Sequence, residues 1–228
     1  MARLTSLKSP RRSPPARAPL TRERVLRAAI RLADRHGIDS LSMRNLGQAL
    51  GVEAMSLYNH VKNKEDLLDG MVDVVYGEID LPGTGVDWRT AMRQRAVSVH
   101  QVLLRHPWAL PLMESRSSPG PANLRHHNAV LGVLRNAGFS VEMAGHAYSV
   151  IDGYLYGFTL TDVALPVRNS QALAKVAGNI LQAAGDNRYP HLAEMTLRYA
   201  ANPGYNFGAE FEYGLDLILD AIQRLTDS

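Results

Sequence analysis

The chain has 228 residues, of which 46% are hydrophobic and 21% charged, a balance that is ordinary for a globular protein with a buried core. It contains no cysteine, which excludes disulfides, thiolate metal sites and cysteine nucleophiles. No apolar run approaches the roughly 20 residues that span a bilayer, and the basic first twenty residues lack the apolar centre of a secretory signal, so we expect a cytoplasmic protein.

The net charge of +3 hides an asymmetry along the chain. Residues 1–64 contain 13 lysine and arginine residues against four acids, a net charge of +9, so the remaining residues carry −6. A basic first third joined to an acidic remainder is typical of a nucleic-acid-binding module attached to another domain. A chance asymmetry without such a role is the alternative at this point.

Residues 1–20 combine four prolines, three serines and five basic residues with few large apolar side chains. This composition predicts a disordered basic arm. Such an arm either follows phosphates or a minor groove, or is a solvated tail without a role, and the sequence favours neither.

A helical pattern begins at Thr21, a suitable N-cap residue, and ends before Gly37, where a left-handed residue would close the helix. Its apolar stripe consists of Val25, Leu26, Ala29, Ile30, Leu32 and Ala33. Next, Ser42 is expected to cap a short helix, Gly51-Val52 to form a tight turn, and Ala54–His60 to form another short helix.

A fourth helix is expected from Asn63 to Asp80, with Asn63 as its N-cap and Asp66 three residues on, as in a capping box. Its expected buried stripe is Leu67, Leu68, Met71, Val72, Val75 and Ile79. The stretch Leu81–Asp87 contains proline and glycine, cannot continue a helix and is expected to link two domains.

The rest of the chain has helical patterns interrupted at 107, 117–121, 138–139, 166, 185–190 and 202–204. No strand pattern and no internal repeat is convincing. We therefore predict an all-α fold with a basic arm at 1–20, a three-helix helix-turn-helix domain plus connecting helix at 21–80, and a larger helical domain at 81–228.

The helices at 21–61 suit DNA, because a major groove admits one helix that a second helix must hold in place. Compact polar side chains suited to phosphates and base edges lie on the last of these helices: Ser56, Tyr58, Asn59 and His60. Leu57 and Val61 would face inward. Lys62 and Lys64 lie beside the next helix N-terminus, where free backbone amides favour a phosphate.

The run Leu41–Leu68 resembles the DNA-binding signature of the tetracycline-repressor (TetR) family. Its core, L-G-V-x-x-x-x-L-Y-x-H-V-K-N-K-x-x-L-L from Leu50 to Leu68, is similar to that of the tetracycline repressors themselves. A signature of this length is highly specific. The resemblance implies a helix-turn-helix domain followed by a helical ligand-binding and dimerisation domain.

The resemblance also implies roles for single residues at matching positions. Arg44 resembles a base-contacting arginine, and Lys64 resembles a phosphate clamp at the fourth helix. Ser56 and Tyr58 resemble phosphate and groove contacts, and His60 resembles a backbone contact.

Three positions depart from the tetracycline repressors, which have Gln, Pro and Trp where this chain has Ala54, Met55 and Asn59. These positions help to read bases, so the operator sequence is expected to differ. The predicted DNA interface consists of Arg44, Ala54, Met55, Ser56, Tyr58, Asn59, His60, Lys62 and Lys64.

The family fold implies a two-fold dimer on a palindromic operator. The last helix offers an apolar stripe of Phe211, Leu215, Ile218, Ile222 and Leu225. A homodimer through Val141–Val163 and Phe207–Thr226 is expected, although part of each stripe also belongs to the core of its own chain.

The second domain resembles the tetracycline-repressor type more loosely, which implies a small-molecule effector. The positions that hold drug and magnesium there fall on Gly77, Arg95 and either Met113 or Glu114, so the required histidines and asparagine are absent. We expect a different effector, no obligatory magnesium and no cofactor. The candidate lining, each member of which equally suits an ordinary core, is Arg95, Val99, Met113, His127, Val130, Tyr148 and Asp152.

Arg95 is the sharpest of these candidates, because a buried guanidinium needs an anion from a ligand or from a protein acid. His126, His127 and His146 do not predict zinc, because adjacent histidines point to different sides of a helix. Nor does the Ser, His and Asp of residues 145–153 predict an enzyme, because one helix spreads them around its faces.

The sequence therefore predicts a DNA-binding transcriptional repressor, dimeric on a palindromic operator and released by a small-molecule effector. Two alternatives remain open. One is a regulator whose C-terminal domain binds a protein partner or only dimerises, and the other is an architectural DNA-binding protein of weak specificity.

Overall fold

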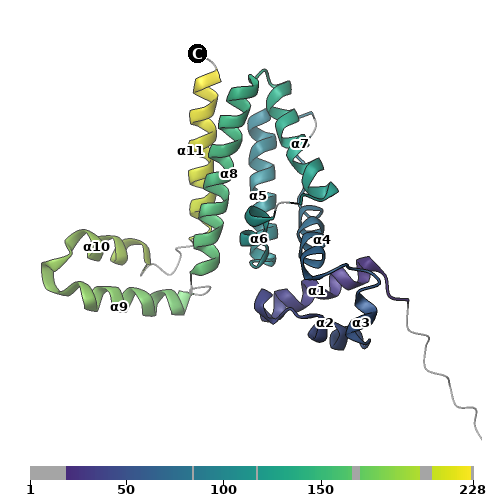
Figure 1. Cartoon of the computed structure of the whole chain (residues 1–228). Coiled ribbons are helices and arrows are strands. Elements are labelled where there is room, and N and C mark those ends of the chain that lie inside the picture. The colour runs from purple at the N-terminus through teal and green to yellow at the C-terminus, as the bar shows by residue number, and fades with distance from the viewer. Residues whose placement is uncertain (1–18, 84, 117, 166–169, 201–206, 227–228) are drawn as a thin grey trace, which may run out of the picture.

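The computed structural model describes residues 19–83, 85–116, 118–165, 170–200 and 207–226. Within these residues the fold is all-α, as predicted, with eleven α-helices and no strand (Figure 1). None of the helices in the described ranges is long and apolar enough to cross a membrane. The expected arm at 1–20 lies outside the described residues except for its last two, and so do the expected breaks at 166 and 202–204.

The N-terminal domain consists of α1 (Arg22–His36), a 3-10 turn (Ile38–Ser40), α2 (Met43–Leu50) and α3 (Ala54–Leu57). Two predicted caps are confirmed, since Thr21 Oγ1 accepts from Arg24 N at 3.2 Å and Ser42 Oγ from Asn45 N at 3.1 Å. Gly51 is left-handed (φ 67°, ψ 38°), as a tight turn requires. Gly37 also has a positive φ of 78°, but its ψ of 161° is extended, so it ends α1 without the expected left-handed helical conformation.

The core of this domain forms where the apolar stripe of α1 meets the other helices. Val25, Ala29 and Ala33 of α1 are buried, with Leu46 of α2 and Leu57 of α3. Helix α1 packs against α2 and α4, and α2 packs against α3. The three helices therefore share one apolar core.

Helix α4 (Lys64–Tyr76) is shorter than the predicted helix, which extended to Asp80. After Tyr76 the hydrogen bonds tighten to i→i+3, from Glu78 N to Val75 O (3.0 Å) and from Ile79 N to Tyr76 O (3.3 Å). Gly77, a poor helix former, begins this turn. Ile79 nevertheless remains buried, so the predicted stripe is correct although the helix ends early.

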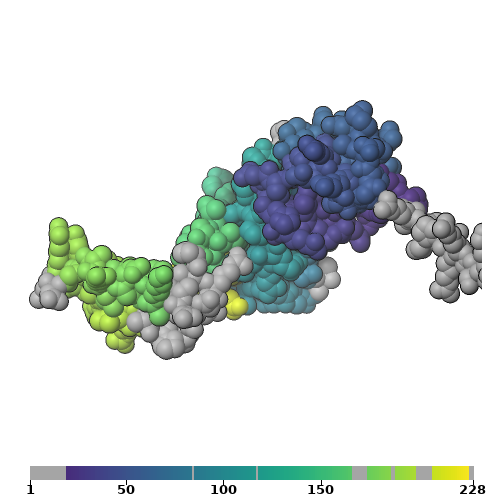
Figure 2. Space-filling view, turned by 90° about the horizontal axis from the view of Figure 1, so that it is seen from below, coloured from purple at the N-terminus to yellow at the C-terminus, as the bar shows by residue number. Residues whose placement is uncertain are grey.

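The larger domain is a bundle that α4 joins from below (Figure 1). Its core helices are α5 (Trp88–Arg105), α6 (Ala109–Ser115), α7 (Pro121–Asn136), α8 (Val141–Ala164) and α11 (Ala209–Thr226). Helix α5 packs against α7, α8 and α11, while α4 packs against α6 and α7. In the view from below, the N-terminal domain covers one end of this bundle (Figure 2).

Helices α9 (Ser170–Arg188) and α10 (Pro190–Met195), followed by a π-helical turn (Thr196–Ala200), project away from the bundle in Figure 1. The break expected at 185–190 is confined to Tyr189, because α9 continues through Gly185 to Arg188.

The α11 stripe that was expected to serve a dimer is mostly core of its own chain. Phe211, Leu215 and Ile222 are buried, whereas Leu225 is 63% exposed. Helix α11 packs on α8 and α5, which is what covers the stripe.

Candidate functional site

The segment expected to enter the major groove is shorter than the predicted helix Ala54–His60, because α3 ends at Leu57. Both His60 N and Val61 N bond to Leu57 O, at 2.9 and 3.0 Å, so the chain turns and carries Val61 into the core. Tyr58, Asn59 and His60 therefore lie on a turn rather than on a helix. Leu57 and Val61 face inward, as predicted.

The expected DNA-contacting side chains lie around this segment with different exposures. Met55 is 75% and Tyr58 44% exposed. Arg44, Asn59, Lys62 and Lys64 are also exposed, and Ala54, Ser56 and His60 are half-buried. The outer surface of this segment is thus formed by the turn after α3, by polar side chains and by the two lysines.

Gly47 of α2 is a residue that sequence reasoning missed. A Cβ there would lie 2.9 Å from Val52 O and 3.2 Å from Ala54 N, both backbone atoms that cannot easily move. Only glycine allows α2 to approach the start of α3 this closely. With the left-handed Gly51, it fixes the angle at which α3 leaves α2.

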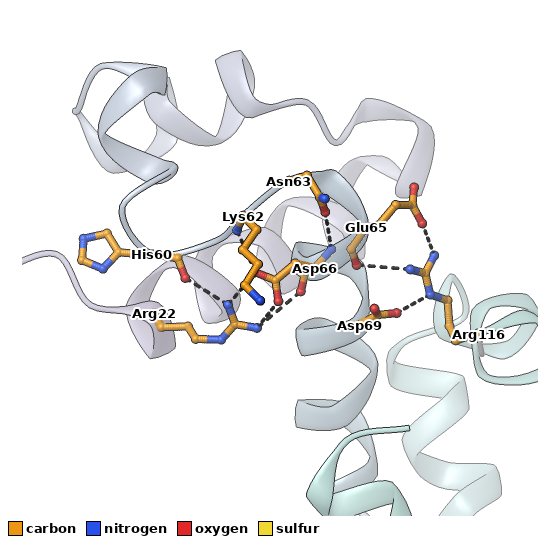
Figure 3. A network of polar contacts seen from close by, with 8 residues as sticks. All are labelled: Arg22, His60, Lys62, Asn63, Glu65, Asp66, Asp69 and Arg116. Atoms are coloured by element: carbon orange, nitrogen blue, oxygen red, sulfur yellow. Dashed lines mark hydrogen bonds and ion pairs between the residues drawn. The ribbon is translucent and has the colours of Figure 1, made fainter. Parts of the chain in front are cut away.

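Arg22 holds the turn after α3 against the first turn of α4 (Figure 3). Its Nη1 donates to His60 O and to Asp66 Oδ2, both at 3.0 Å, and its Nη2 donates to Asp66 Oδ1 at 2.7 Å. Lys62 N donates to Asp66 Oδ2 at 2.7 Å. The Arg22 hydrogen bond lowers the pKa of the Asp66 carboxyl, so the pair is ionised at neutral pH.

The N-terminus of α4 is capped by Asn63 as predicted, with Asn63 Oδ1 accepting from Asp66 N at 2.8 Å. In a capping box the Asp66 carboxylate would also accept from Asn63 N. Here it accepts from Lys62 N and from Arg22 instead. The sequence did not indicate that Arg22 would pair with Asp66, because 44 residues separate them.

Acidic side chains in the first turn of α4 would repel a phosphate there, but arginines pair with them. Arg22 pairs with Asp66, and Arg116 donates from Nη1 to Glu65 at 2.7 Å and from Nε to Asp69 at 2.6 Å (Figure 3). The positive end of the α4 dipole therefore remains favourable for a phosphate, and two exposed lysines lie beside it.

Further polar contacts join the N-terminal domain to the bundle. His106, between α5 and α6, lies with Nδ1 2.7 Å from Asp34 Oδ1 and with Nε2 3.1 Å from Glu78 Oε2. Trp108 Nε1 donates to the same Asp34 oxygen at 2.7 Å. Arg116, which follows α6, adds the contact to α4. The two domains are thus attached at several points.

Inside the bundle, four residues of the candidate effector lining come together. Arg95 is fully buried and forms a two-pronged ion pair with Asp152, through Nη1 to Oδ1 and through Nη2 to Oδ2 at 3.2 Å. Tyr148 Oη lies 2.5 Å from His127 Nδ1. The anion that a buried Arg95 requires is therefore a protein acid. Val99, Met113 and Val130 are buried in the surrounding apolar core.

Three residues of this interior cluster were not among the candidates: Tyr76, His126 and Tyr156. Arg95 Nε donates to His126 Nε2 at 3.2 Å, and the Tyr76 ring lies 5.6 Å from the His126 ring. Burial raises the pKa of Tyr76, and the Tyr156 side chain opposes that rise. The sequence showed adjacent histidines at 126 and 127 but not which of them would face Arg95.

Burial and the ion pair set the charges of the cluster. Burial alone would lower the pKa of Arg95, but the charge and hydrogen bond of Asp152 outweigh it and raise that pKa. Burial, assisted by the Arg95 charge, lowers the pKa of His126 to about 3. Burial raises the pKa of Tyr148, and the Asp152 charge is the second largest cause of this rise. At neutral pH the cluster thus holds one ion pair and neutral partners.

An open groove of about 370 Å³ lies elsewhere, between the linker and the outer side of α5. Leu81, Val97 and Gln101 contribute to its lining. None of the candidate effector residues lines it.

Two protein-family models match the chain. Residues 25–71 match "Bacterial regulatory proteins, tetR family", and residues 81–226 match "Tetracyclin repressor-like, C-terminal domain". A transcriptional regulator of Saccharopolyspora erythraea is 38% identical over 60% of this chain, a match that spans 59% of that protein. The transcriptional repressor DrrR1 of Streptomyces coeruleorubidus is 32% identical over 92% of this chain and 81% of its own length.

Solved structures also resemble the fold. A possible TetR family transcriptional regulator of Streptomyces coelicolor A3(2) has 31% identity and a TM-score of 0.74, covering 90% of this chain and 99% of that one. The Streptomyces coelicolor protein ActR in complex with actinorhodin has 25% identity and a TM-score of 0.73, covering 91% and 98%.

We expect Arg22→Met to lower the free energy of unfolding by about 1 kcal/mol, because it removes a half-exposed ion pair and the bond to His60 O. Arg27→Met is the control, since the partner of Arg27 is the exposed Glu23 on the same helix. Urea denaturation measures both. Equal losses in the two variants would contradict a special role for Arg22.

We expect Arg95→Met to destabilise the protein by about 3–5 kcal/mol, because it leaves Asp152 buried without its partner. The double variant Arg95→Met/Asp152→Leu should recover most of that loss, since no unpaired charge remains. Urea denaturation again provides the measurement. A double variant no more stable than Arg95→Met would show that the ion pair itself, rather than charge balance, stabilises the interior.

Proposed function

The chain belongs to the TetR family of bacterial transcriptional regulators, and from this we propose that it is a repressor that binds a palindromic operator as a homodimer and is released by a small-molecule effector. Regulators of this family bind DNA and are not enzymes. Because the proposed target is operator DNA, the proposed place of action is the bacterial cytoplasm. The observation that carries the proposal is that α4 joins the DNA-binding unit to the interior polar cluster.

The proposed DNA contacts are those of the candidate interface around α3. Ser56, Tyr58 and His60 would contact the backbone and groove, and Arg44 a base edge. Support comes from Lys62 and Lys64, which are exposed at the start of α4, where the acids Glu65 and Asp66 are each paired with an arginine. Ala54, Met55 and Asn59 would set the operator sequence.

The proposed dimer surface lies on α8 and α11, which run side by side (Figure 1). Large apolar side chains on these two helices are more than half exposed: Val141, Val150, Leu160, Tyr213, Leu217 and Leu225. A Cβ added at Gly145, Gly153 or Gly157 would meet no atom of this chain within 4 Å, so α8 leaves room for another helix. Two such helix pairs would form a four-helix bundle.

The proposed effector site is the interior cluster around Arg95, His127, Tyr148 and Asp152. Its chemistry differs from a drug–magnesium site, because Arg95 already has a protein carboxylate as counter-ion. That ActR was solved in complex with actinorhodin supports small-molecule binding in this fold. Tyr76 belongs both to this cluster and to α4, so a ligand here contacts the helix that carries the DNA-binding unit.

The direct test is selection of binding sequences from random duplex DNA, followed by footprinting of the selected site. A short palindrome protected over two successive turns supports the repressor. Diffuse protection without a preferred sequence would instead support an architectural protein. A metabolite screen in which no compound releases the selected DNA would favour a C-terminal domain that binds a protein or only dimerises.

We expect Lys64→Ala to weaken binding to every duplex sequence and to flatten the slope of log affinity against log salt by about one unit, because one phosphate contact is lost. Lys175→Ala, an exposed lysine on α9, is the matched control and should leave the slope unchanged. Fluorescence anisotropy at several salt concentrations measures both slopes. An unchanged slope for Lys64→Ala would refute the phosphate contact.

We expect Leu217→Glu to convert the dimer to monomers at micromolar concentration, because it would bury a charge in the proposed four-helix interface. Leu124→Glu is the control, since Leu124 is similarly exposed (56% against 54%) but belongs to α7, which is not one of the two proposed interface helices. Sedimentation velocity distinguishes the two species. A dimer that survives Leu217→Glu would place the interface elsewhere.

A further inference from the structure

His126 is a fully buried side chain whose hydrogen-bonding state the neighbouring arginine determines. Arg95 Nε is a donor with no lone pair to offer, so His126 Nε2, at 3.2 Å, must accept. The ring is neutral at physiological pH, because burial and the Arg95 charge lower its pKa to about 3. A neutral imidazole that accepts at Nε2 carries its hydrogen on Nδ1. His126 Nδ1 is therefore a donor.

That donor has no partner. Among the described residues, His126 Nδ1 is the buried side-chain nitrogen or oxygen that makes no hydrogen bond. A buried donor left without an acceptor costs about 1–3 kcal/mol. Such groups are rare in native proteins and call for a physical reason.

The polar groups around His126 do not supply the acceptor, because they bond to one another. Asp152 accepts from Arg95, and Tyr148 Oη lies 2.5 Å from His127 Nδ1. What lies beside the His126 ring is aromatic: the rings of Tyr76 and His127 are each 5.6 Å away. The unpaired N–H thus lies in aromatic surroundings.

We propose that the effector is an uncharged, planar aromatic molecule with a carbonyl oxygen, and that this oxygen accepts the hydrogen bond of His126 Nδ1. The inference rests on the proposed function, in which a small molecule binds in this interior cluster. An anionic effector fits less well, since Asp152 already balances Arg95 and a second buried anion would be uncompensated. The aromatic plane packs against Tyr76 and so contacts α4.

The first experiment compares ligand pairs that differ only in the carbonyl: 9-fluorenone with fluorene, 1-indanone with indane, and anthraquinone with anthracene. Each is titrated into the wild-type protein by calorimetry. We expect the ketones to bind at least tenfold more tightly than their hydrocarbons. Equal binding within each pair, or no binding of any ketone, would overturn the proposal.

Variants then assign the preference to one residue. In His126→Met the thioether can still accept weakly from Arg95 but donates nothing, so the ketone preference should disappear. His146→Met, on the exposed side of α8, is the control and should keep the preference. A preference that survives His126→Met in a folded protein would contradict the proposal.

The second experiment needs no variant and applies even if His126→Met fails to fold. Long-range ¹H–¹⁵N correlation spectra of the wild-type protein report which ring nitrogen of His126 carries the hydrogen. We expect the Nδ1–H form, with a downfield shift of that proton on adding 9-fluorenone. An Nε2–H form, or a proton unaffected by bound ketone, would overturn the proposal.

DNA binding is measured separately on the same protein. Operator binding without any ketone preference would contradict the proposed ligand class but would still support the proposed repressor function. Loss of the proposed function would appear instead as an absence of any selected DNA site, whatever the ketones do.

Discussion

The structure depends on one constraint: helix α4 is attached at both ends to different parts of the molecule. At its first turn, Asp66 bonds to Arg22 and to the backbone of Lys62. At its last residue, Tyr76 packs against His126 inside the bundle. Between these ends the inward side of the helix is buried. A rigid, doubly attached helix cannot tilt at one end without moving the other.

This constraint gives the proposed regulation a physical basis. A ligand changes DNA affinity only if it binds two arrangements of the protein with different affinity, typically by about 1–3 kcal/mol. Arg116 and His106 add attachments between the domains, so the DNA-binding unit follows the bundle instead of swinging on a loose linker. In the proposed regulation, a ligand that contacts Tyr76 would therefore also shift the turn after α3.

Local features were predictable from the sequence, and contacts between distant segments were not. The caps at Thr21, Ser42 and Asn63 and the inward-facing Leu57 follow from neighbouring residues, so the all-α fold and the starts of these helices were predicted. The early ends of α3 and α4 depend on i→i+3 bonds that periodicity does not reveal.

The interior shows the same limit. Arg95 and Asp152 were both candidates, but 57 residues separate them and their pairing appears only in the fold. The predicted lining included His127 and not His126, because packing decides which side of α7 faces Arg95. The α11 stripe likewise gave an apolar face without showing that α5 and α8 cover most of it.

Hydrogen exchange along α4 tests the central claim most directly. Amides from Leu68 to Tyr76 should exchange in one cooperative event, with the same opening free energy and the same denaturant dependence in both halves of the helix. That result means that the DNA-binding unit and the bundle share α4 as one rigid element. If the half near Leu68 opened independently while the half near Tyr76 stayed protected, α4 would not connect the two and the account would be contradicted.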